Sequence, residues 1–438
     1  MPPELLAEIF FFCLPFDKDM FVDPDPADAP LVLCAVCRQW RSIALTTSKL
    51  WSSIYFDCDR WAIFETKSEA EEAALYVEVC RDWIARARST PLSLQLYANV
   101  YDGAGSVVDS LLEIIGGVSQ QWQNIDIDIG KDLPLPFPGN GKYPLLEKLN
   151  VSSPPPDRSV LSFRDAPRLH DVFIPTYTTR IELPWHQLTK FGTERMDIEA
   201  CLDLLRHASN LVDAHLRILP YDASTLLQTI FSLPQLHSLN LSGAAWSDDD
   251  EDMSEMMPMT LFKCLKTPAL KTLALGFENV DIEDSTDISP FLSFVSQSSF
   301  QLDTLVLSLV PHTTDALIKC LKATPSVIRL KLQISHQIVD ADPLFVQLTD
   351  DRDFLPKLES LSIALSSWRP NIDALVVVNM LLWRCIISPV TRLQSFRFLE
   401  DSIKSHIKAH PAYLELEASG IDLGLGTERY YDEFMHLP

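Results

Sequence analysis

The sequence has no apolar run long enough to cross a membrane. The best candidate, ALVVVNMLLW at residues 374–383, is bounded by Asp373 and Arg384, and it falls short of the roughly 18 apolar residues that a spanning helix needs. Glu4 and Glu8 interrupt the apolar start of the chain, where a secretory leader would continue without charges. We therefore expect neither a membrane segment nor a leader.

Basic residues and paired cysteines are also scarce. The 36 Lys and Arg residues stand against 60 Asp and Glu residues, giving a net charge of −24 and a pI near 4.7. A field of this sign repels phosphate backbones, so no nucleic-acid partner is expected. The nine cysteines are odd in number and scattered among mostly apolar neighbours, which is typical of reduced thiols. These features predict a cytoplasmic or nuclear protein.

Familiar catalytic motifs are missing as well. The chain contains no nucleophile elbow, phosphate-binding loop, HExxH pair or kinase signature. Cys34 and Cys37 form a CxxC, and His406 and His410 are four residues apart, but neither pair has the nearby further ligands that zinc requires. We expect no enzyme, no metal and no cofactor, and we favour helix packing over a metal or redox role for the CxxC.

What is present is a globular composition. Of 438 residues, 47% are hydrophobic and 22% are charged, which is the balance of a folded chain. This length fits two or three domains, or one long repeat array with a small module attached.

The N-terminal segment is apolar around much of its circumference. Pro2 and Pro3 suit a first helical turn, and Pro15 ends the helix. At 100° per residue its apolar side chains cover an arc of roughly 200°, wider than the stripe of about 100° that faces one core. They are Leu5, Leu6, Ile9, Phe10, Phe12, Cys13 and Leu14. The excess predicts a covering partner; burial of the whole helix under the downstream domain is the alternative.

An acidic, proline-rich loop at residues 16–30 leads to a second predicted helix, residues 31–45. Asp28 and Pro30 mark its start. Its apolar side carries Leu33, Val36, Cys37, Trp40, Ile43 and Ala44. Leu50, Trp51 and Ile54 resume the apolar pattern after a short break.

In this order and spacing, residues 2–55 resemble an F-box. The likeness is carried by Pro3, Glu4, Leu5 and Leu6, by Ile9 and Phe10, by Leu14 and Pro15, by Val36, Cys37 and Arg38, by Trp40 and Arg41, by Ile43 and Ala44, and by Leu50 and Trp51. The resemblance implies a short helical bundle that binds the Skp adaptor of Skp–cullin–F-box ubiquitin ligases. The adaptor-binding residues it implies are Pro3, Glu4, Leu5, Leu6, Ile9, Phe10, Leu14, Pro15, Val36, Cys37, Arg38 and Trp40. Residues 1–58 are interpreted as this module.

Residues 59–90 are expected to couple the module to the rest of the chain. Most of this segment, residues 60–88, has helical composition, and its acidic first half and Arg-rich end complement the helix dipole. Residues 91–100 and 122–130 then read as strands, and residues 105–121 as a helix.

Repetition is the main feature of residues 91–438. A frame of three apolar positions, usually opened by proline, recurs nine times. Its first apolar positions are Leu146, Leu169, Leu211, Leu236, Leu270, Leu302, Val327, Leu358 and Leu393, and Leu188 opens a degenerate copy. Helix-like stretches such as residues 197–208, 222–233, 313–323 and 371–386 lie between copies. The frame resembles irregular leucine-rich repeats, which implies an α/β solenoid with a curved parallel sheet. A doubly wound α/β domain is the alternative.

Residues between the inward positions are expected on an open strand face, the usual binding surface of solenoids. We predict a target-binding face at Ser238, Asn240, Thr272, Arg329, Lys331, Gln333, Ser360, Ser362, Ser395 and Arg397. The acidic run at residues 247–258 is expected to be a solvated loop, with a docking or calcium-sensitive segment as the alternative. Ile421, Asp422 and Leu423 are expected to add a last strand.

The resemblance implies the substrate-recognition subunit of a Skp–cullin–F-box E3 ubiquitin ligase. Its partners would be a Skp-type adaptor, through it a cullin–RING ligase, and a protein target of unknown identity. Two alternatives stay open: an interaction scaffold without a role in ubiquitination, and a hydrolase in an unfamiliar α/β body. A deep pocket with convergent polar groups would favour the hydrolase.

Overall fold

A computed structural model describes residues 1–15, 21–58, 67–98, 105–129, 137, 141–152, 160–178, 180–219, 229–243, 258–277, 287–311, 313–334, 338–365, 372–387, 391–399 and 401–426. Over these residues the chain is a mixed α/β protein with twelve α-helices and a parallel sheet of fourteen strands, which confirms the expected α/β class. It divides into two compact units, Met1–Glu194 and Arg195–Pro438. None of the described helices is long and apolar enough to span a membrane.

Three short helices begin the first unit. They are α1 (Pro3–Phe12), α2 (Leu31–Val36) and α3 (Arg38–Thr46), and a 3₁₀ turn at Ser48–Trp51 follows. α1 packs against α3 through Phe10 and Trp40, whose ring centroids are 4.9 Å apart. Leu6 and Phe10 are its buried residues, so one stripe of α1 faces the core of its own chain.

The single helix predicted for residues 31–45 is wrong, because Cys37 has an extended backbone and separates α2 from α3. Its Sγ accepts a hydrogen bond from the Trp40 amide at 3.4 Å and caps α3. Arg41 Nε donates to the Cys34 carbonyl at 2.7 Å, at the end of α2. Both bonds satisfy backbone groups that a helix end leaves unpaired, which stabilises the break.

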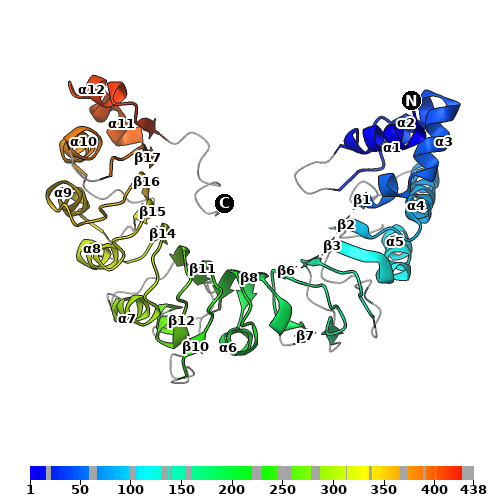
Figure 1. The fold of residues 1–438 in the computed structure, drawn as a ribbon, viewed down its shortest axis with the longest axis horizontal. Coiled ribbons are helices and arrows are strands. Elements are labelled where there is room, and N and C mark those ends of the chain that lie inside the picture. The colour runs from blue at the N-terminus through cyan, green and yellow to red at the C-terminus, as the bar shows by residue number, and fades with distance from the viewer. Residues whose placement is uncertain are drawn as a thin grey trace. The chain divides into compact units, whose positions relative to one another are not determined.

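Five parallel strands of the main sheet lie within the first unit, and a sixth runs from it into the second. They are β1 (Ser53–Asp57), β2 (Leu92–Ala98), β3 (Trp122–Ile129), β4 (Lys148–Val151), β6 (Asp171–Phe173) and β8 (Lys190–Met196). The helices α4 (Lys67–Ala87) and α5 (Gly105–Gly117) lie together on one side of β1–β3 (Figure 1). β1 lies within residues 1–58 and pairs with β2, so the segment interpreted as the module also supplies a strand to the sheet.

Two buried tryptophans fix α4 to the N-terminal segment. Trp51 and Trp83 pack edge to face, with ring centroids 4.9 Å apart. The Trp51 indole donates to the Ala44 carbonyl at 2.8 Å, and the Trp83 indole donates to the Ser53 carbonyl at 3.1 Å. Both N–H groups are therefore satisfied inside the core, and α4 packs against the N-terminal segment.

Eight parallel strands follow in the second unit. They are β9 (Asp213–Ile218), β11 (Ser238–Gly243), β13 (Thr272–Phe277), β14 (Thr304–Ser308), β15 (Arg329–Ile334), β16 (Ser360–Leu365), β17 (Ser395–Leu399) and β18 (Asp422–Leu425). Their register aligns the frame positions into buried rows, for example Leu239, Leu273, Leu305, Leu330, Leu361 and Phe396. The strands predicted from all nine copies of the frame are confirmed, as is the final strand.

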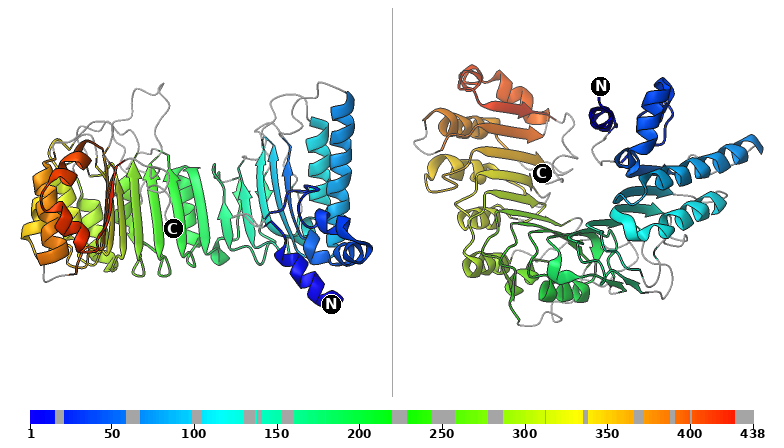
Figure 2. Two further views of the ribbon diagram at one scale, coloured as in Figure 1. Left: turned by 90° about the horizontal axis from the view of Figure 1, so that it is seen from above. Right: turned by 45° about the vertical axis from the view of Figure 1, so that its right-hand side comes forward.

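Helices connect most strands of the second unit. They are α6 (Ile198–His207), α7 (Ser289–Ser298), α8 (Thr314–Lys322), α9 (Asp342–Asp350), α10 (Ala374–Leu382), α11 (Asp401–Ala409) and α12 (Tyr413–Ala418). Figure 2 shows α8–α11 along one face of β14–β17. The helices predicted near residues 197–208, 313–323 and 371–386 are confirmed.

Short strands lie in the described parts of other connections. β10 (Phe231–Ser232) pairs with β12 (Leu265–Lys266), and β5 (Leu161–Ser162) pairs with β7 (Ile181–Glu182). The helix predicted at residues 222–233 is therefore wrong at its C-terminal end, and residues 222–228 lie outside the described part of the chain. The acidic run, apart from Pro258, also lies outside it.

Candidate protein-binding surfaces

An exposed apolar surface runs along α1. Leu5 is 56% exposed, Ile9 45% and Phe12 82%. Their spacing places these side chains on one face of the helix, beside the stripe of Leu6 and Phe10 that is buried. On α2, Val36 and Val32 are exposed at the same spacing. We call Leu5, Ile9 and Phe12 the exposed apolar face of α1.

The structure separates the residues implied for adaptor binding into two groups. The exposed or half-buried group contains Pro3, Glu4, Leu5, Ile9, Pro15, Val36, Cys37, Arg38 and Trp40. Leu6, Phe10 and Leu14 are buried in the first unit. These three side chains pack within the chain itself because each lies about one turn from the next, on the face turned to α3. They hold α1 in place and do not belong to its exposed surface.

Two exposed thiols lie at this end of the chain. Cys13 follows α1, and Cys37 caps α3. Six other cysteines are buried, and none of the nine forms a disulfide. Burial raises the pKa of the Cys201 and Cys320 thiols to about 12, so these thiols stay protonated and unreactive near neutral pH. No group of three or more His, Cys, Asp and Glu side chains within the described ranges could hold a metal ion.

The ten residues predicted for target binding lie on one face of the second unit's sheet. The pairing of β11, β13, β14, β15, β16 and β17 aligns them in three neighbouring rows. The first row contains Ser238, Thr272, Arg329, Ser360 and Ser395; the second contains Asn240, Lys331, Ser362 and Arg397; and the third contains Gln333. Arg329 is exposed and the others are half-buried.

One of the basic side chains on this face is compensated by a carboxylate. Both Arg397 Nη atoms donate to the Asp422 carboxylate, with the Nη1–Oδ1 distance at 3.0 Å. Gly424 makes room for this pair, since a Cβ there would lie 2.5 Å from Arg397 Cδ. Arg329 Nε donates to Thr304 Oγ1 at 3.0 Å. Asp422 therefore compensates the charge of Arg397, whereas the side chain of Arg329 remains exposed.

Sequence reasoning missed a pocket of about 270 Å³ on the sheet of the first unit. Its lining residues come from β2, β3, β4, β6 and the segment before β1: Phe21, Ser93, Asn124, Ile125, Asp126, Lys148, Leu149, Asn150, Asp171 and Phe173. We call this the polar pocket. The alternation of residues 122–129 places Asp126 between the inward Ile125 and Ile127. This pattern alone predicts that Asp126 lies on the open face of the strand.

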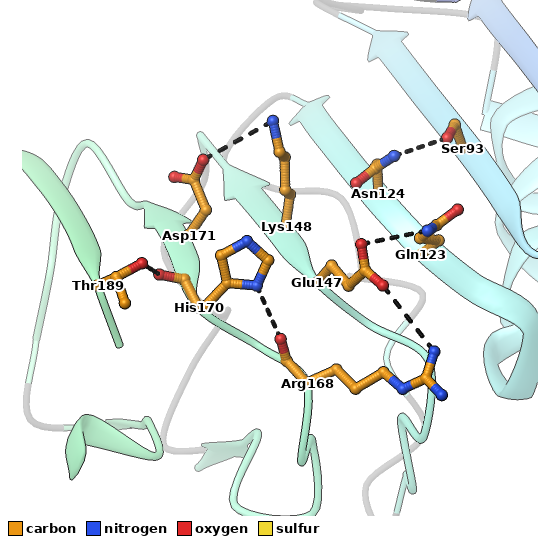
Figure 3. A network of polar contacts seen from close by, with 9 residues as sticks. All are labelled: Ser93, Gln123, Asn124, Glu147, Lys148, Arg168, His170, Asp171 and Thr189. Atoms are coloured by element: carbon orange, nitrogen blue, oxygen red, sulfur yellow. Dashed lines mark hydrogen bonds and ion pairs between the residues drawn. The ribbon is translucent and has the colours of Figure 1, made fainter. Parts of the chain in front are cut away.

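Hydrogen bonds hold the polar side chains of this pocket. Asn124 Nδ2 donates to Ser93 Oγ at 2.8 Å, and Lys148 Nζ lies 3.9 Å from Asp171 Oδ2. Figure 3 shows Lys148 and Asp171 pointing toward one another from neighbouring strands. Farther along the strands, Glu147 accepts a hydrogen bond from Gln123 at 3.1 Å.

Comparisons with known proteins identify no family for this chain. No family model matches the chain, and no curated protein matches it. A solved crystal structure of a Bacteroides fragilis protein is similar at 10% identity and a TM-score of 0.27, over 86% of this chain and 74% of that chain. A likeness at this level carries no argument about family or function.

Proposed function

We propose that this chain is the substrate-recognition subunit of a Skp–cullin–F-box E3 ubiquitin ligase. Residues 2–55 would bind the Skp adaptor, and the repeats, as a leucine-rich-repeat-like solenoid, would bind a protein target through their strand face. The chain would form and break no covalent bond, because its part is to hold the target near the ubiquitin-charged enzyme. This role belongs to the cytoplasm or the nucleus.

The observation that carries the proposal is the exposed apolar face of α1. Leu5, Ile9 and Phe12 leave large apolar side chains in water, which costs free energy unless a partner covers them. Leu5 and Ile9 also belong to the ordered set of residues that resembles an F-box. A helix presenting spaced apolar anchors is a common way to bind another protein.

Co-purification tests the proposal directly. The full chain is expressed with a Skp-type adaptor, and a stoichiometric complex is expected on size-exclusion chromatography. Failure of the wild-type chain to retain the adaptor would overturn the ligase proposal and favour a scaffold without a role in ubiquitination. Retention of the adaptor without any effect of the complex on a bound partner's lifetime would favour the scaffold as well.

Cysteine labelling gives a second prediction. In the free chain, iodoacetamide is expected to modify the exposed Cys13 and Cys37, and to spare Cys201 and Cys320, whose thiols are buried with a raised pKa. Adaptor binding is expected to slow labelling of the two exposed thiols by about tenfold or more, because the proposed contact removes them from water. Mass spectrometry of peptides measures each site. Unchanged labelling of Cys13 in the complex would place the adaptor elsewhere.

The polar pocket does not support a hydrolase. Ser93 Oγ accepts a hydrogen bond from the Asn124 amide, and an amide cannot take the proton of a serine nucleophile. A serine nucleophile needs an adjacent general base. The convergent polar groups therefore fit binding better than bond cleavage.

A further inference from the structure

Carboxylates outnumber cations among the side chains that line the polar pocket of the first unit. Asp126 and Asp171 contribute two carboxylates, and Asn150 contributes an amide oxygen, against the single cation of Lys148. Asp126 and Asn150 are direct neighbours across β3 and β4, and Lys148 and Asp171 are direct neighbours across β4 and β6. A ligand bearing several N–H donors and a positive charge would match this set.

One acceptor in the pocket lacks a donor. Asn150 Oδ1 is buried and has no hydrogen-bond partner among the described residues. Buried acceptors are nearly always satisfied in native proteins, by the protein, by water or by a ligand. Asp126 already accepts from Gln95 Nε2 at 3.0 Å, so Gln95 holds that carboxylate beside the unsatisfied amide.

The ion pair between Lys148 and Asp171 is weak. Lys148 Nζ is 3.9 Å from the Asp171 carboxylate, and the Lys148 side chain is 59% exposed. Such a pair contributes little stability. A guanidinium group could displace the ammonium, because its planar N–H groups bind a carboxylate through two parallel hydrogen bonds. Lys148 would then turn to solvent.

Aromatic rings complete the pocket. Phe21 and Phe173 both line it, and a guanidinium group binds favourably against an aromatic face. Gly192 on β8 accommodates the Phe173 ring, since a Cβ there would lie 2.5 Å from Phe173 Cδ2. The volume of about 270 Å³ is below the usual range of roughly 300–1,000 Å³ for small-molecule sites, so one side chain fits better than a nucleotide.

We propose that the polar pocket binds an arginine side chain of the target protein. The occupant's positive charge agrees with the net charge of −24 on the chain, which attracts basic partners. A carboxylate or phosphate occupant would meet two carboxylates and only one cation. This inference rests on the proposed function only in assigning the arginine to the target protein. The binding of arginine itself is measured without the adaptor.

Saturation-transfer NMR with the full chain tests the pocket. The probes are acetyl-Gly-Arg-Gly-amide and its citrulline and glutamate counterparts. The arginine peptide is expected to bind with a Kd on the order of 1 mM, as suits one buried side chain. The citrulline peptide, which keeps the shape and loses the charge, is expected to give no signal. Absence of arginine binding at 10-fold that concentration, or stronger binding of the glutamate peptide, overturns the proposal.

The variant Lys148→Met distinguishes an arginine ligand from an anionic one. Removing the competing ammonium is expected to tighten arginine binding by about threefold or more, whereas an anionic ligand would lose its only cation and bind more weakly. Asp171→Asn is expected to weaken arginine binding by about tenfold. Lys148 is exposed, so its variant keeps the fold, and circular dichroism checks both variants. Weaker arginine binding by Lys148→Met refutes the assignment whether or not the adaptor binds.

Discussion

A chain carrying Leu5→Asp and Ile9→Asp is expected to lose adaptor binding by about 100-fold or more, because two carboxylates would have to be buried in an apolar contact. Both side chains are about half exposed in the free chain, so the folded state should tolerate the change. The measurement is the Kd of the purified chain for a Skp-type adaptor by isothermal titration calorimetry. Circular dichroism and the melting temperature establish that the variant is folded.

A matched control separates the apolar surface from general charge effects. Leu75 on α4 is 60% exposed, and Val346 on α9 is 43% exposed, close to the values of the test pair. Leu75→Asp with Val346→Asp adds the same charge and removes similar apolar area, yet it should leave the Kd for the adaptor unchanged within about twofold. If control and test variants lose adaptor binding equally, α1 is not the adaptor contact.

Phe10 shows what the sequence could not decide on this helix. An apolar arc of roughly 200° contains both a core stripe and a second face, and the residue types on the two faces are alike. Only the position of α3, with Trp40 against Phe10, assigns Leu6 and Phe10 to the interior. An aspartate at Phe10 would damage the core, so it cannot test binding.

The repeat frame was predictable because its inward positions repeat at fixed offsets within short strands. Leu239 and Leu241, for example, align with Leu273 and Leu275 by pairing alone, which is the period-two pattern that a strand imposes. The break at Cys37 was not predictable from that kind of pattern. It depends on two specific bonds, from the Trp40 amide and the Arg41 guanidinium, and helical periodicity continues on both sides of it.

The polar pocket was missed for a different reason. Asp126, Lys148 and Asp171 are separated by more than 20 residues each along the chain and meet only through the register of three strands. The rule that found the face of the second unit, reading the residues between inward positions, also applies to the copies at Leu146 and Leu169. If the rule is also applied to residues 122–129, the sequence alone predicts that Asp126, Lys148 and Asp171 share one face of the sheet.

Arg384 is the clearest case in which sequence and structure differ. It bounds the apolar stretch at residues 374–383, a place where a charged side chain normally reaches water, yet it is fully buried. Its guanidinium donates to the carbonyls of Leu348 at 2.8 Å, Leu355 at 3.0 Å and Phe354 at 2.5 Å. Leu355 adopts a left-handed backbone, with φ at 48°, which is costly for a branched residue. Burial lowers the pKa of Arg384 to about 10.

Arg384→Met is expected to lower the free energy of unfolding by about 3–5 kcal/mol, because the three buried carbonyls lose their donors and the left-handed turn loses its support. Arg384→Lys keeps a charge and fewer donors, and about half of that loss is expected. Urea unfolding followed by circular dichroism measures both. Arg392→Met, at an exposed arginine in the same unit, serves as the control with a change below about 0.5 kcal/mol. A loss of less than about 1 kcal/mol for Arg384→Met would mean that the turn holds its conformation without the guanidinium, and that the buried charge is not what maintains the loop before β16.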